Sequence, residues 1–567
     1  MRRHPMFTFA LVAALAGCAS APSRPTGNQR YDLVIRNGLV YDGSGAPPKR
    51  VDIAVAGDRI AALLPAGAPA DARAVIDAAG QAVAPGFINV LSWSTESLIA
   101  DGRGVSDTKQ GVTLEIFGEG WSMGPLNAKM KADSVEQQTD IKYEIEWTTL
   151  GEYLDFLVRR GIAPNVASFV GATTVRIHEL GEADVQPDAA QLARMQDLVR
   201  AAMRDGALGV GASLIYPPAF YARPDELIAL SKAAAELGGG YVAHMRSEAN
   251  QLLEALDETI AIGRATGQHV EAYHLKAAGE RNWPKMAQAI AKIEAARASG
   301  VQIGANMYTY TAGATGLSAC MPPWVQDGGH DAMIKRLKDP ATRARVISEM
   351  KVPSNSWENL GLLAGGPERV LLLGFKTDKL KPLTGKNLAE VASQRGTSRE
   401  DTIVDLIIED DTRVEAAYFL MSEDNVELGL KQPWVSLGSD AESSAPEGVF
   451  LKSSTHPRAY GNFARFLGRY ARERKLLPLE QAIHRITGLP ASNWKLKGRG
   501  CLDAGCYADV VVFDAATVSD HATFDRPQQY ATGVKHVLVN GVLVLRDGEH
   551  TGATPGRVVR GPGWTGK

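Results

Sequence analysis

GYVAHMRSEAN at residues 240–250 and GQHVEAYHLKAAG at residues 267–279 are the stretches that decide the fold predicted for this chain. Each contains a short apolar run that ends in a histidine, His244 in the first and His274 in the second. The residues between them are apolar at helical spacing and stop at Gly267. Strand, helix and strand in that order form a crossover that makes the two strands parallel. The histidines should therefore converge above one end of a sheet.

In a (β/α)₈ barrel, the carboxyl ends of the strands are where active sites lie. Two imidazoles placed there suit zinc, which binds histidine nitrogen readily. The alternative is a pair of ordinary histidines at strand ends that are satisfied by hydrogen bonds. The pair alone does not decide between these interpretations, so the rest of the chain must.

Composition narrows the class of protein. The chain has 567 residues, 45% of them hydrophobic, and a formal net charge of −3. These values are typical of a globular protein with a large core, and they argue against a nucleic-acid partner. Such a length suggests several domains, but a barrel is long as a single unit. Cys501 and Cys506 are close enough in sequence to pair in an oxidising compartment, yet with so few cysteines we expect no disulfide.

The first 29 residues predict export. Arg2 and Arg3 precede the apolar run MFTFALVAALAG, which is too short for a membrane-spanning helix and suits a signal peptide. The run ends in LAGC, which resembles a lipoprotein processing site with Cys18 as the lipidated residue. We therefore predict a signal peptide at 1–18, a flexible tether at 19–29, and a lipid anchor facing the periplasm, with the outer membrane as one option for its location. The alternatives are a plain secretory signal, which would release the protein into the periplasm, or a wrongly assigned start.

Both ends of the remaining chain have the sequence pattern of short β-strands. YDLVIRNGLVYDGSG near the start and VKHVLVNGVLVLRDG near the end are short alternating runs with Asn-Gly and Asp-Gly turns. We predict a small β-sandwich built from residues 30–85 and 491–567, with residues 86–490 inserted between its halves. A segment at about 317–367 is rich in proline, glycine and charge, and we read it as an insertion after the seventh strand that could cover the barrel mouth.

The middle of the chain alternates strand-like and helix-like runs, which favours an α/β fold with a (β/α)₈ barrel. The expected strands lie at residues 111–117, 163–170, 208–214, 241–244, 270–274, 301–307 and 434–438. The expected helices lie at residues 189–205, 225–237, 283–298 and 462–475.

Two carboxylates join the histidines at predicted strand ends. Glu119 follows the run VTLEIF between two glycines, and Asp440 follows VSLGS. Three ligands with one open position suit catalytic zinc, and a further aspartate can move a proton between water and a leaving nitrogen. If the extended backbone continues, Arg246 and Lys276 share a face with His244 and His274 and could meet an anionic group. The alternative is that both are solvated loop cations.

The chain after the tether resembles the N-acyl-D-amino-acid deacylases (D-aminoacylases) of the amidohydrolase superfamily. The resemblance rests on an ordered series of motifs that includes YDLVIRNGLVYDGSG, VIDAAGQAVAPGFI, GVTLEIFGEGWSMGPL, YVAHMRSE, HLKAAG, YTYTAGATGL, VSLGSDAE and THPRAYGNFARFLGRY. The family fold is a barrel with a small two-segment β domain, which agrees with the prediction from the residues.

The resemblance also implies roles for individual residues. It implies His244 and His274 as zinc ligands and Asp440 as the catalytic acid/base. It implies that Lys276 and Tyr216 contact the substrate carboxylate. Either Tyr308 or Tyr310 matches a tyrosine that positions the scissile amide, and both alternatives stay open.

Two departures from the family pattern matter. Superfamily members commonly carry Asp-x-His-x-His after the PGFI motif, where this chain has Leu91 and Trp93 in the histidine places. Neither side chain can bind zinc, so we expect one ion per chain. The second departure is Glu119, which stands where well-known deacylases have a cysteine; glutamate is an acceptable zinc ligand.

The resemblance therefore implies hydrolysis of N-acyl-D-amino acids to a carboxylate and a free D-amino acid, with metal-bound water as the nucleophile. Two alternatives remain. One keeps the metal chemistry and changes the substrate to a D-configured dipeptide or a cyclic amide. The other is a degenerate barrel that serves as a lipid-anchored binding protein.

Overall fold

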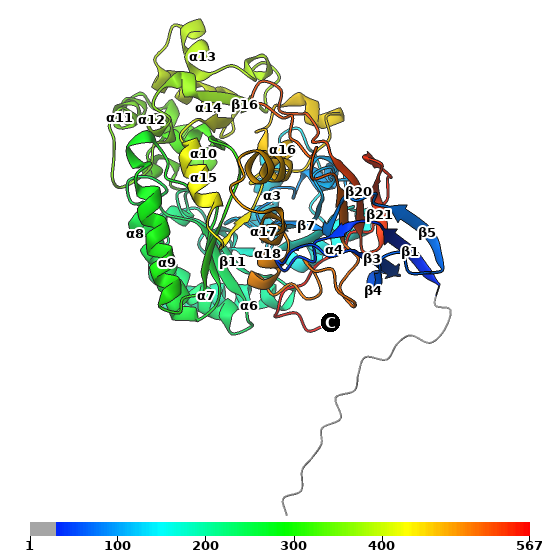
Figure 1. Ribbon diagram of the computed structural model, residues 1–567. Coiled ribbons are helices and arrows are strands. Elements are labelled where there is room, and N and C mark those ends of the chain that lie inside the picture. The colour runs from blue at the N-terminus through cyan, green and yellow to red at the C-terminus, as the bar shows by residue number, and fades with distance from the viewer. Residues whose placement is uncertain (1–29, 567) are drawn as a thin grey trace, which may run out of the picture.

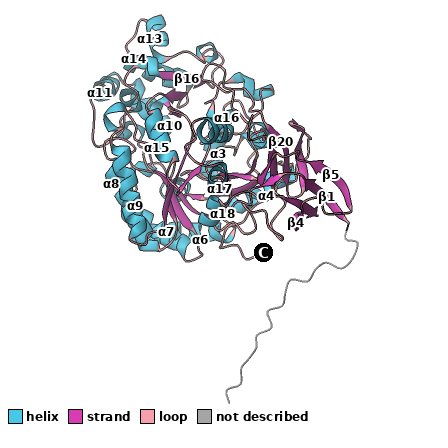
Figure 2. Cartoon of the chain, in the orientation of Figure 1, coloured by secondary structure: helices cyan, strands magenta, loops and turns pink. Residues whose placement is uncertain are grey.

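The structure, a computed structural model, describes residues 30–566, so the predicted signal peptide, Cys18 and tether lie outside the described part of the chain. Its centre is a barrel of parallel strands (Figures 1 and 2). In barrel order these are β7 (Phe87–Asn89), β8 (Val112–Phe117), β9 (Asn165–Ser168) continued by β10 (Val170–Gly171), β11 (Gly209–Ser213), β12 (Gly240–His244), β13 (Val270–Ala272), β14 (Ile303–Met307) and β18 (Val435–Leu437). The barrel prediction is confirmed, and each strand expected in this region overlaps an observed one.

Backbone hydrogen bonds bring the last barrel strand against the first. The Val90 N–H donates to the Leu437 carbonyl over 3.3 Å, and the Asp440 N–H donates to the Leu91 carbonyl over 2.9 Å. The strands are buried on both faces, as in β8, where all six residues are buried. Parallel strands that are covered on both faces have continuous apolar sequences. The run VTLEIF could therefore be recognised as a strand from the sequence alone.

Helices form the outer layer of the barrel, as the cyan ribbons around the magenta strands in Figure 2 show. They include α4 (Leu150–Arg160), α5 (Ala172–Leu180), α6 (Ala189–Arg204), α7 (Pro224–Ala235), α8 (Leu252–Thr266), α9 (Lys285–Ala298), α17 (Leu479–Arg485) and α18 (Gly488–Asn493). The sequence sets several of their ends: Thr149 caps α4 and Asp188 caps α6 through capping boxes. The helix expected at 462–475 differs, because α16 (Arg458–Arg465) begins earlier and continues as a π-helical run, Phe466–Glu473.

A β-sandwich from both chain ends lies against the barrel (Figure 1). One sheet holds β1 (Tyr31–Arg36), β3 (Val51–Ala56), β4 (Arg59–Pro65) and β5 (Ala72–Asp77). The other holds β2 (Leu39–Val40), β6 (Ala82–Pro85), β19 (Val510–Phe513), β20 (Val534–Val539), β21 (Val542–Arg546) and β22 (Glu549–His550). β6 pairs antiparallel with β19, so the second sheet joins the two ends of the chain directly. One apolar core contains residues of both sheets, among them Leu33, Ile53 and Val512.

The predicted insertion at 317–367 lies within a longer excursion between β14 and β18. The excursion has its own antiparallel sheet, β15 (Gly313–Gly316), β17 (Glu415–Tyr418) and β16 (Val370–Gly374). Its helices are α10 (His330–Lys338), α11 (Pro340–Met350), α12 (Leu360–Leu363), α13 (Leu388–Arg395), α14 (Arg399–Asp410) and α15 (Glu423–Leu430). In Figure 1 most of these elements rise above the barrel, on the side away from the β-sandwich.

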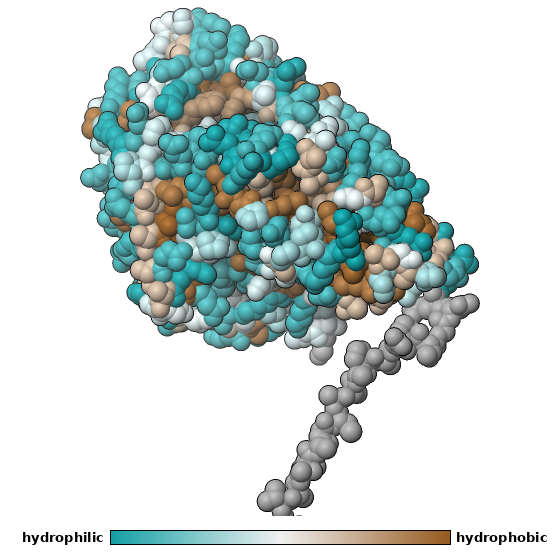
Figure 3. Space-filling model, viewed as in Figure 1, coloured by the Kyte–Doolittle hydropathy of each residue, from teal (hydrophilic) through white to brown (hydrophobic). Residues whose placement is uncertain are grey.

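The surface is mixed in character. On the face seen in Figure 3, hydrophilic residues cover most of the molecule and hydrophobic residues gather in separate patches. No helix within residues 30–566 combines the length and the apolar character that crossing a membrane requires.

Our expectation that the cysteines remain unpaired is wrong for one pair. Cys501 and Cys506 form a disulfide, with their Cα atoms 6.2 Å apart. The tight turn between them supplies a separation that a disulfide can bridge, which sequence spacing alone does not reveal. Cys320 is a free, buried thiol.

This disulfide leads to a first prediction. Replacing both cysteines with serine (C501S/C506S) removes a constraint on the unfolded chain, which loop-closure arguments value at about 2 kcal/mol for so short a loop. We expect the free energy of unfolding, measured in urea, to fall by about that amount. Cys320→Ser is the control: without reduction, the peptide that contains Cys501 and Cys506 should keep the mass of its disulfide-bonded form. Free thiols at both positions in protein purified under oxidising conditions would contradict the assignment.

Candidate metal centre and active site

Glu119, His244 and His274 converge at the carboxyl end of the barrel. One ligand atom from each of these buried residues lies within 4.8 Å of the others. His244 Nδ1 is 3.1 Å and His274 Nε2 is 2.9 Å from the same carboxylate oxygen, Glu119 Oε1. The three side chains come from the ends of β8, β12 and β13, so the geometry brings together the residues that the sequence singled out.

The loop that carries Glu119 depends on its two glycines. Gly118 has φ +107°, and a Cβ there would lie 2.4 Å from the Phe169 carbonyl oxygen. Gly120 has φ +73°, and a Cβ there would lie 2.4 Å from Ser213 Oγ. The Ser213 hydroxyl also donates to the Glu119 carbonyl over 2.8 Å. Larger residues at either glycine would displace the loop, so Gly-Glu-Gly is a requirement for turning the carboxylate inward.

His274 lies two residues beyond the end of β13, in a left-handed backbone conformation with φ +31°. Its backbone N–H donates to Asn306 Oδ1 over 2.9 Å, which fixes the turn. The sequence places His274 at the strand end, and the structure places it just past that end. The turn directs Nε2 towards Glu119.

Glu248 holds the other side of the His274 ring. Its Oε1 lies 2.8 Å from His274 Nδ1, and Lys276 Nζ donates to Glu248 Oε1 over 2.6 Å. A histidine that binds a metal through Nε2 carries its proton on Nδ1, and a carboxylate partner fixes that tautomer and the ring orientation. Glu248 is in the right place for this function. The ammonium of Lys276 offsets its buried charge and also lies 2.8 Å from His274 Nδ1.

The charged side chains of the centre shift one another's pKa values. Burial of Glu119 opposes ionisation, but the two histidines outweigh it, so its pKa lies below the ordinary value. Burial and Lys276 both lower the pKa of His274, yet Glu248 and Glu119 outweigh them and raise it to about 9. Two buried carboxylates thus create a strong local preference for positive charge, which a bound cation would also satisfy.

Asp440 lies beside this group. It has φ +52° and follows β18, and its side chain is largely buried. Arg458 Nη1 lies 2.7 Å from Asp440 Oδ2. Burial raises the pKa of Asp440, and the nearby Arg458 guanidinium opposes that rise. The indole N–H of Trp93 donates to Asp440 Oδ1 over 3.1 Å. Asp440 therefore has one partner at each carboxylate oxygen.

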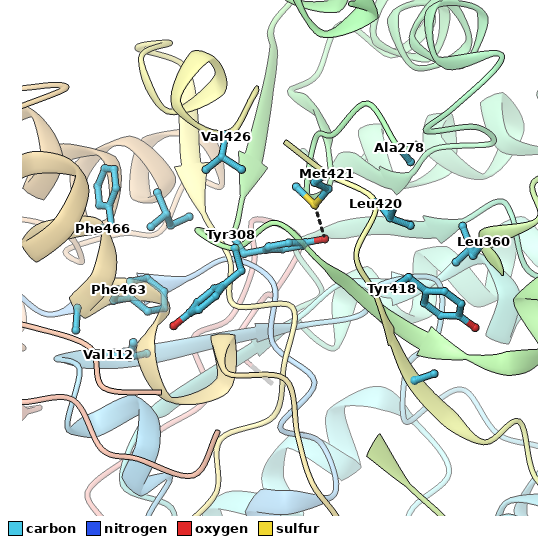
Figure 4. Packing of buried hydrophobic residues seen from close by; sticks show 14 of the residues in the cluster. Val112, Ala278, Tyr308, Leu360, Tyr418, Leu420, Met421, Val426, Phe463 and Phe466 are labelled. Atoms are coloured by element: carbon cyan, nitrogen blue, oxygen red, sulfur yellow. Dashed lines mark hydrogen bonds between the residues drawn. The ribbon is translucent and has the colours of Figure 1, made fainter. Parts of the chain in front are cut away.

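The structure separates the two candidate tyrosines. The Tyr308 ring lies 6.4 Å from the His274 ring, and Lys276 Nζ lies 5.7 Å from the Tyr308 ring centre. The Tyr308 hydroxyl points towards Met421 Sδ, 3.4 Å away (Figure 4). Tyr310 instead directs its hydroxyl to Asp520, 3.4 Å away. Of the two, Tyr308 lies against the metal centre.

The remaining predicted contacts fall in different places. Tyr216 packs edge-on against His244, with ring centres 5.2 Å apart. Lys276 is only 5% exposed, so the alternative of a solvated loop cation is wrong for it, while its contact with substrate stays a prediction. Arg246 makes two hydrogen bonds to Glu258 and two more to the carbonyls of Phe220 and Ala222. The scaffold uses most of the Arg246 donors, which argues against the substrate contact predicted for it.

Three residues near the site escaped the sequence analysis: Glu248, Arg413 and Arg458. Glu248 lies four residues after His244, a spacing that could have suggested a partner for a ligand. Arg458 stands in the motif THPR, and only the fold brings it to Asp440. Arg413 comes from the excursion, and its guanidinium lies 5.2 Å from the Tyr216 ring centre. No local pattern distinguishes it from other surface arginines.

The excursion also supports the site. Glu358 Oε1 accepts hydrogen bonds from the Ser247 hydroxyl over 2.5 Å and from the backbone N–H groups of Glu248 and Ala249 over 2.8 and 2.7 Å. Burial raises the pKa of Glu358 to about 7. This contact fixes the loop that carries Glu248, so the excursion helps to hold the surroundings of the metal centre in place.

The donor set fits a zinc ion. Two imidazole nitrogens and one carboxylate oxygen converge, all on buried side chains, and three protein ligands leave a position open. The orienting carboxylate Glu248 supplies the support that ligating histidines require.

The support from Glu248 can be tested directly. Glu248→Gln keeps the shape of the side chain but removes its charge, so zinc affinity should fall about 10- to 100-fold. Competition with a chromophoric chelator measures this change. Glu254→Gln, an exposed position on α8, is the matched control and should leave zinc affinity unchanged. Equal affinities for both variants would show that Glu248 does not orient a ligand.

Comparisons with known proteins identify the family of this chain. The amidohydrolase family (Amidohydro_3) matches residues 74–545. The chain is 34% identical over 538 residues to a D-aminoacylase from Alcaligenes xylosoxydans xylosoxydans, covering 94% of this chain and 98% of the relative.

Two solved structures are also similar over 94% of this chain and all of theirs. One is a D-aminoacylase described as having a binuclear metal centre with one-metal activation and second-metal attenuation, at 32% identity and a TM-score of 0.76. The other is an N-acyl-D-glutamate deacylase from Bordetella bronchiseptica with zinc and a phosphonate inhibitor, at 31% identity and a TM-score of 0.76. The chain therefore belongs to the amidohydrolase family, in the group of the N-acyl-D-amino-acid deacylases.

Proposed function

We propose that this enzyme hydrolyses the amide bond of N-acyl-D-amino acids with a single zinc ion held by Glu119, His244 and His274. The observation that carries the proposal is the convergence of these ligands beside Asp440, which the Trp93 indole N–H links to Glu119. The activities of the relatives set the substrate class.

A divalent ion at this site supplies a Lewis acid and an activated water molecule at neutral pH. Asp440 takes the proton of the attacking water and returns it to the departing amide nitrogen. Its two partners, Arg458 and Trp93, hold the carboxylate in one orientation for both steps. We propose that Tyr308, whose ring lies 6.4 Å from that of His274, positions the scissile amide.

Recognition of the α-carboxylate requires positive charge near His244. Tyr216 lies between His244 and Arg413, with 5.2 Å separating its ring centre from each. The charge of Lys276 is already matched by Glu248. We propose that Arg413 and Tyr216 bind the carboxylate together, with Lys276 behind them. A carboxylate held on this side and an acyl group held near Asp440 would fix the configuration of the α-carbon.

The cellular location remains a proposal. Lipidation of Cys18 and a site facing the periplasm are our inference from the LAGC motif. The Cys501–Cys506 disulfide supports an oxidising compartment, because the cytosol keeps most thiols reduced.

Matched N-acetyl-D and N-acetyl-L amino acids test the activity. We expect primary amine to be released from the D series only. Asp440→Asn should lower kcat at least about 100-fold because it removes the proton acceptor, while the zinc content stays at the wild-type level. Amine release measured by a fluorogenic reagent, together with metal analysis, provides both readouts.

Three results would contradict the proposal. Preferential hydrolysis of the L series would overturn the assignment of configuration. Full turnover by Asp440→Asn would remove that residue from the proton transfers. Hydrolysis of dipeptides or cyclic amides alone would point to the alternative substrates.

A further inference from the structure

Trp93 occupies a position that the proposed chemistry does not explain. Its indole N–H donates to two carboxylates at once, Glu119 Oε2 over 3.0 Å and Asp440 Oδ1 over 3.1 Å. Glu119 follows β8 and Asp440 follows β18, the two barrel neighbours of β7, after which Trp93 lies. One N–H group therefore joins a proposed metal ligand to the proposed acid/base.

Backbone hydrogen bonds fix the position of the loop that carries Trp93. The Trp93 N–H donates to the Ala441 carbonyl over 3.0 Å, and Ser92 pairs with Ala441 as a parallel bridge. The loop carrying the indole is thus bonded to the loop carrying Asp440. Although Trp93 as a whole residue is 38% exposed, its N–H end points inward to the two carboxylates.

Two carboxylates that face one point repel each other unless something positive lies between them. A second metal ion is one solution, and an N–H donor is another. Here the second solution is present, because Leu91 and Trp93 offer no metal-binding atom. Asp440 is also absent from the single group of metal-binding side chains found within residues 30–566.

We propose, on the basis of the function proposed above, that Trp93 is a positioning residue that replaces a second metal ion. Its indole N–H holds the Asp440 carboxylate towards the attacking water, and the ring keeps a second cation away from Glu119 Oε2. The enzyme binds one ion at saturation and is not attenuated by excess metal, unlike the related D-aminoacylase with its described second-metal attenuation.

The first test measures stoichiometry and does not depend on turnover. Metal-free wild-type protein is titrated with Zn²⁺ by calorimetry, and the bound metal is counted by elemental mass spectrometry. We expect one ion per chain for the wild type and two for the double variant Leu91→His/Trp93→His. Two ions on the wild type, or inhibition of the wild type by excess Zn²⁺, would overturn the proposal even if the double variant does not fold.

The second test isolates the N–H group. Trp93→Phe keeps an aromatic ring but loses the donor, so we expect kcat to fall roughly 10- to 100-fold, as for loss of a hydrogen bond to a charged group. KM and the content of one zinc ion should stay close to wild-type values. Trp564→Phe, a tryptophan of similar exposure near the C-terminus, is the matched control and should keep full kcat. Wild-type kcat in Trp93→Phe would show that the indole only fills space.

Failure of the proposed function is a separate result. If no N-acyl-D-amino acid is hydrolysed by any form, the substrate assignment fails, while the stoichiometry still decides whether Trp93 excludes a second ion. If the wild type hydrolyses the D series but binds two ions, the substrate assignment stands and the inference about Trp93 fails.

Discussion

The parallel register of β12 with β13 is the constraint on which the site depends. Ala243 pairs with Ala272, which puts His244 opposite Tyr273. The left-handed turn at His274 then brings its ring back to His244, with ring centres 4.5 Å apart. Glu119 reaches the same point from β8 because two glycines allow its loop to turn. A slip of one residue in either strand would direct one histidine away from the barrel mouth. The chemistry of the site is therefore set by strand pairing together with the turn at His274.

Much of the fold was predictable because local sequence patterns mark many of its strands and turns. Buried parallel strands such as Val112–Phe117 are continuous apolar runs, and Asn540-Gly541 marks a hairpin between β20 and β21. The metal ligands were predictable because each one follows such a run. What could not be predicted depends on contacts across long sequence separations. The ion pair between Arg458 and Asp440, and the packing of Arg413 on Tyr216, exist only once the barrel has closed and the excursion has folded.

The errors have similar physical causes. The Cys501–Cys506 disulfide depends on a turn that brings the two Cα atoms within bonding reach, which residue spacing does not specify. Arg246 follows His244 at a spacing that suggests a shared face, but the strand ends at His244 and the arginine turns to Glu258. Periodicity holds only while the extended backbone continues.

The two carboxylate oxygens of Glu119 have different partners. Oε1 faces His244 and His274, and Oε2 accepts the Trp93 N–H that links Glu119 to Asp440. Glu248 and Lys276 balance charge on the opposite side of His274. The negative charge of the buried carboxylates is therefore balanced by one expected metal ion and by N–H donors of the protein itself. This distribution of charge favours a single metal ion.

A crystal structure with anomalous scattering data collected at the zinc absorption edge tests the central claim most directly. The account predicts one anomalous peak per chain, in contact with Glu119, His244 Nδ1 and His274 Nε2, with the Trp93 N–H still bridging the two carboxylates. A second peak between Glu119 and Asp440, or a single peak bound by other residues, would contradict it.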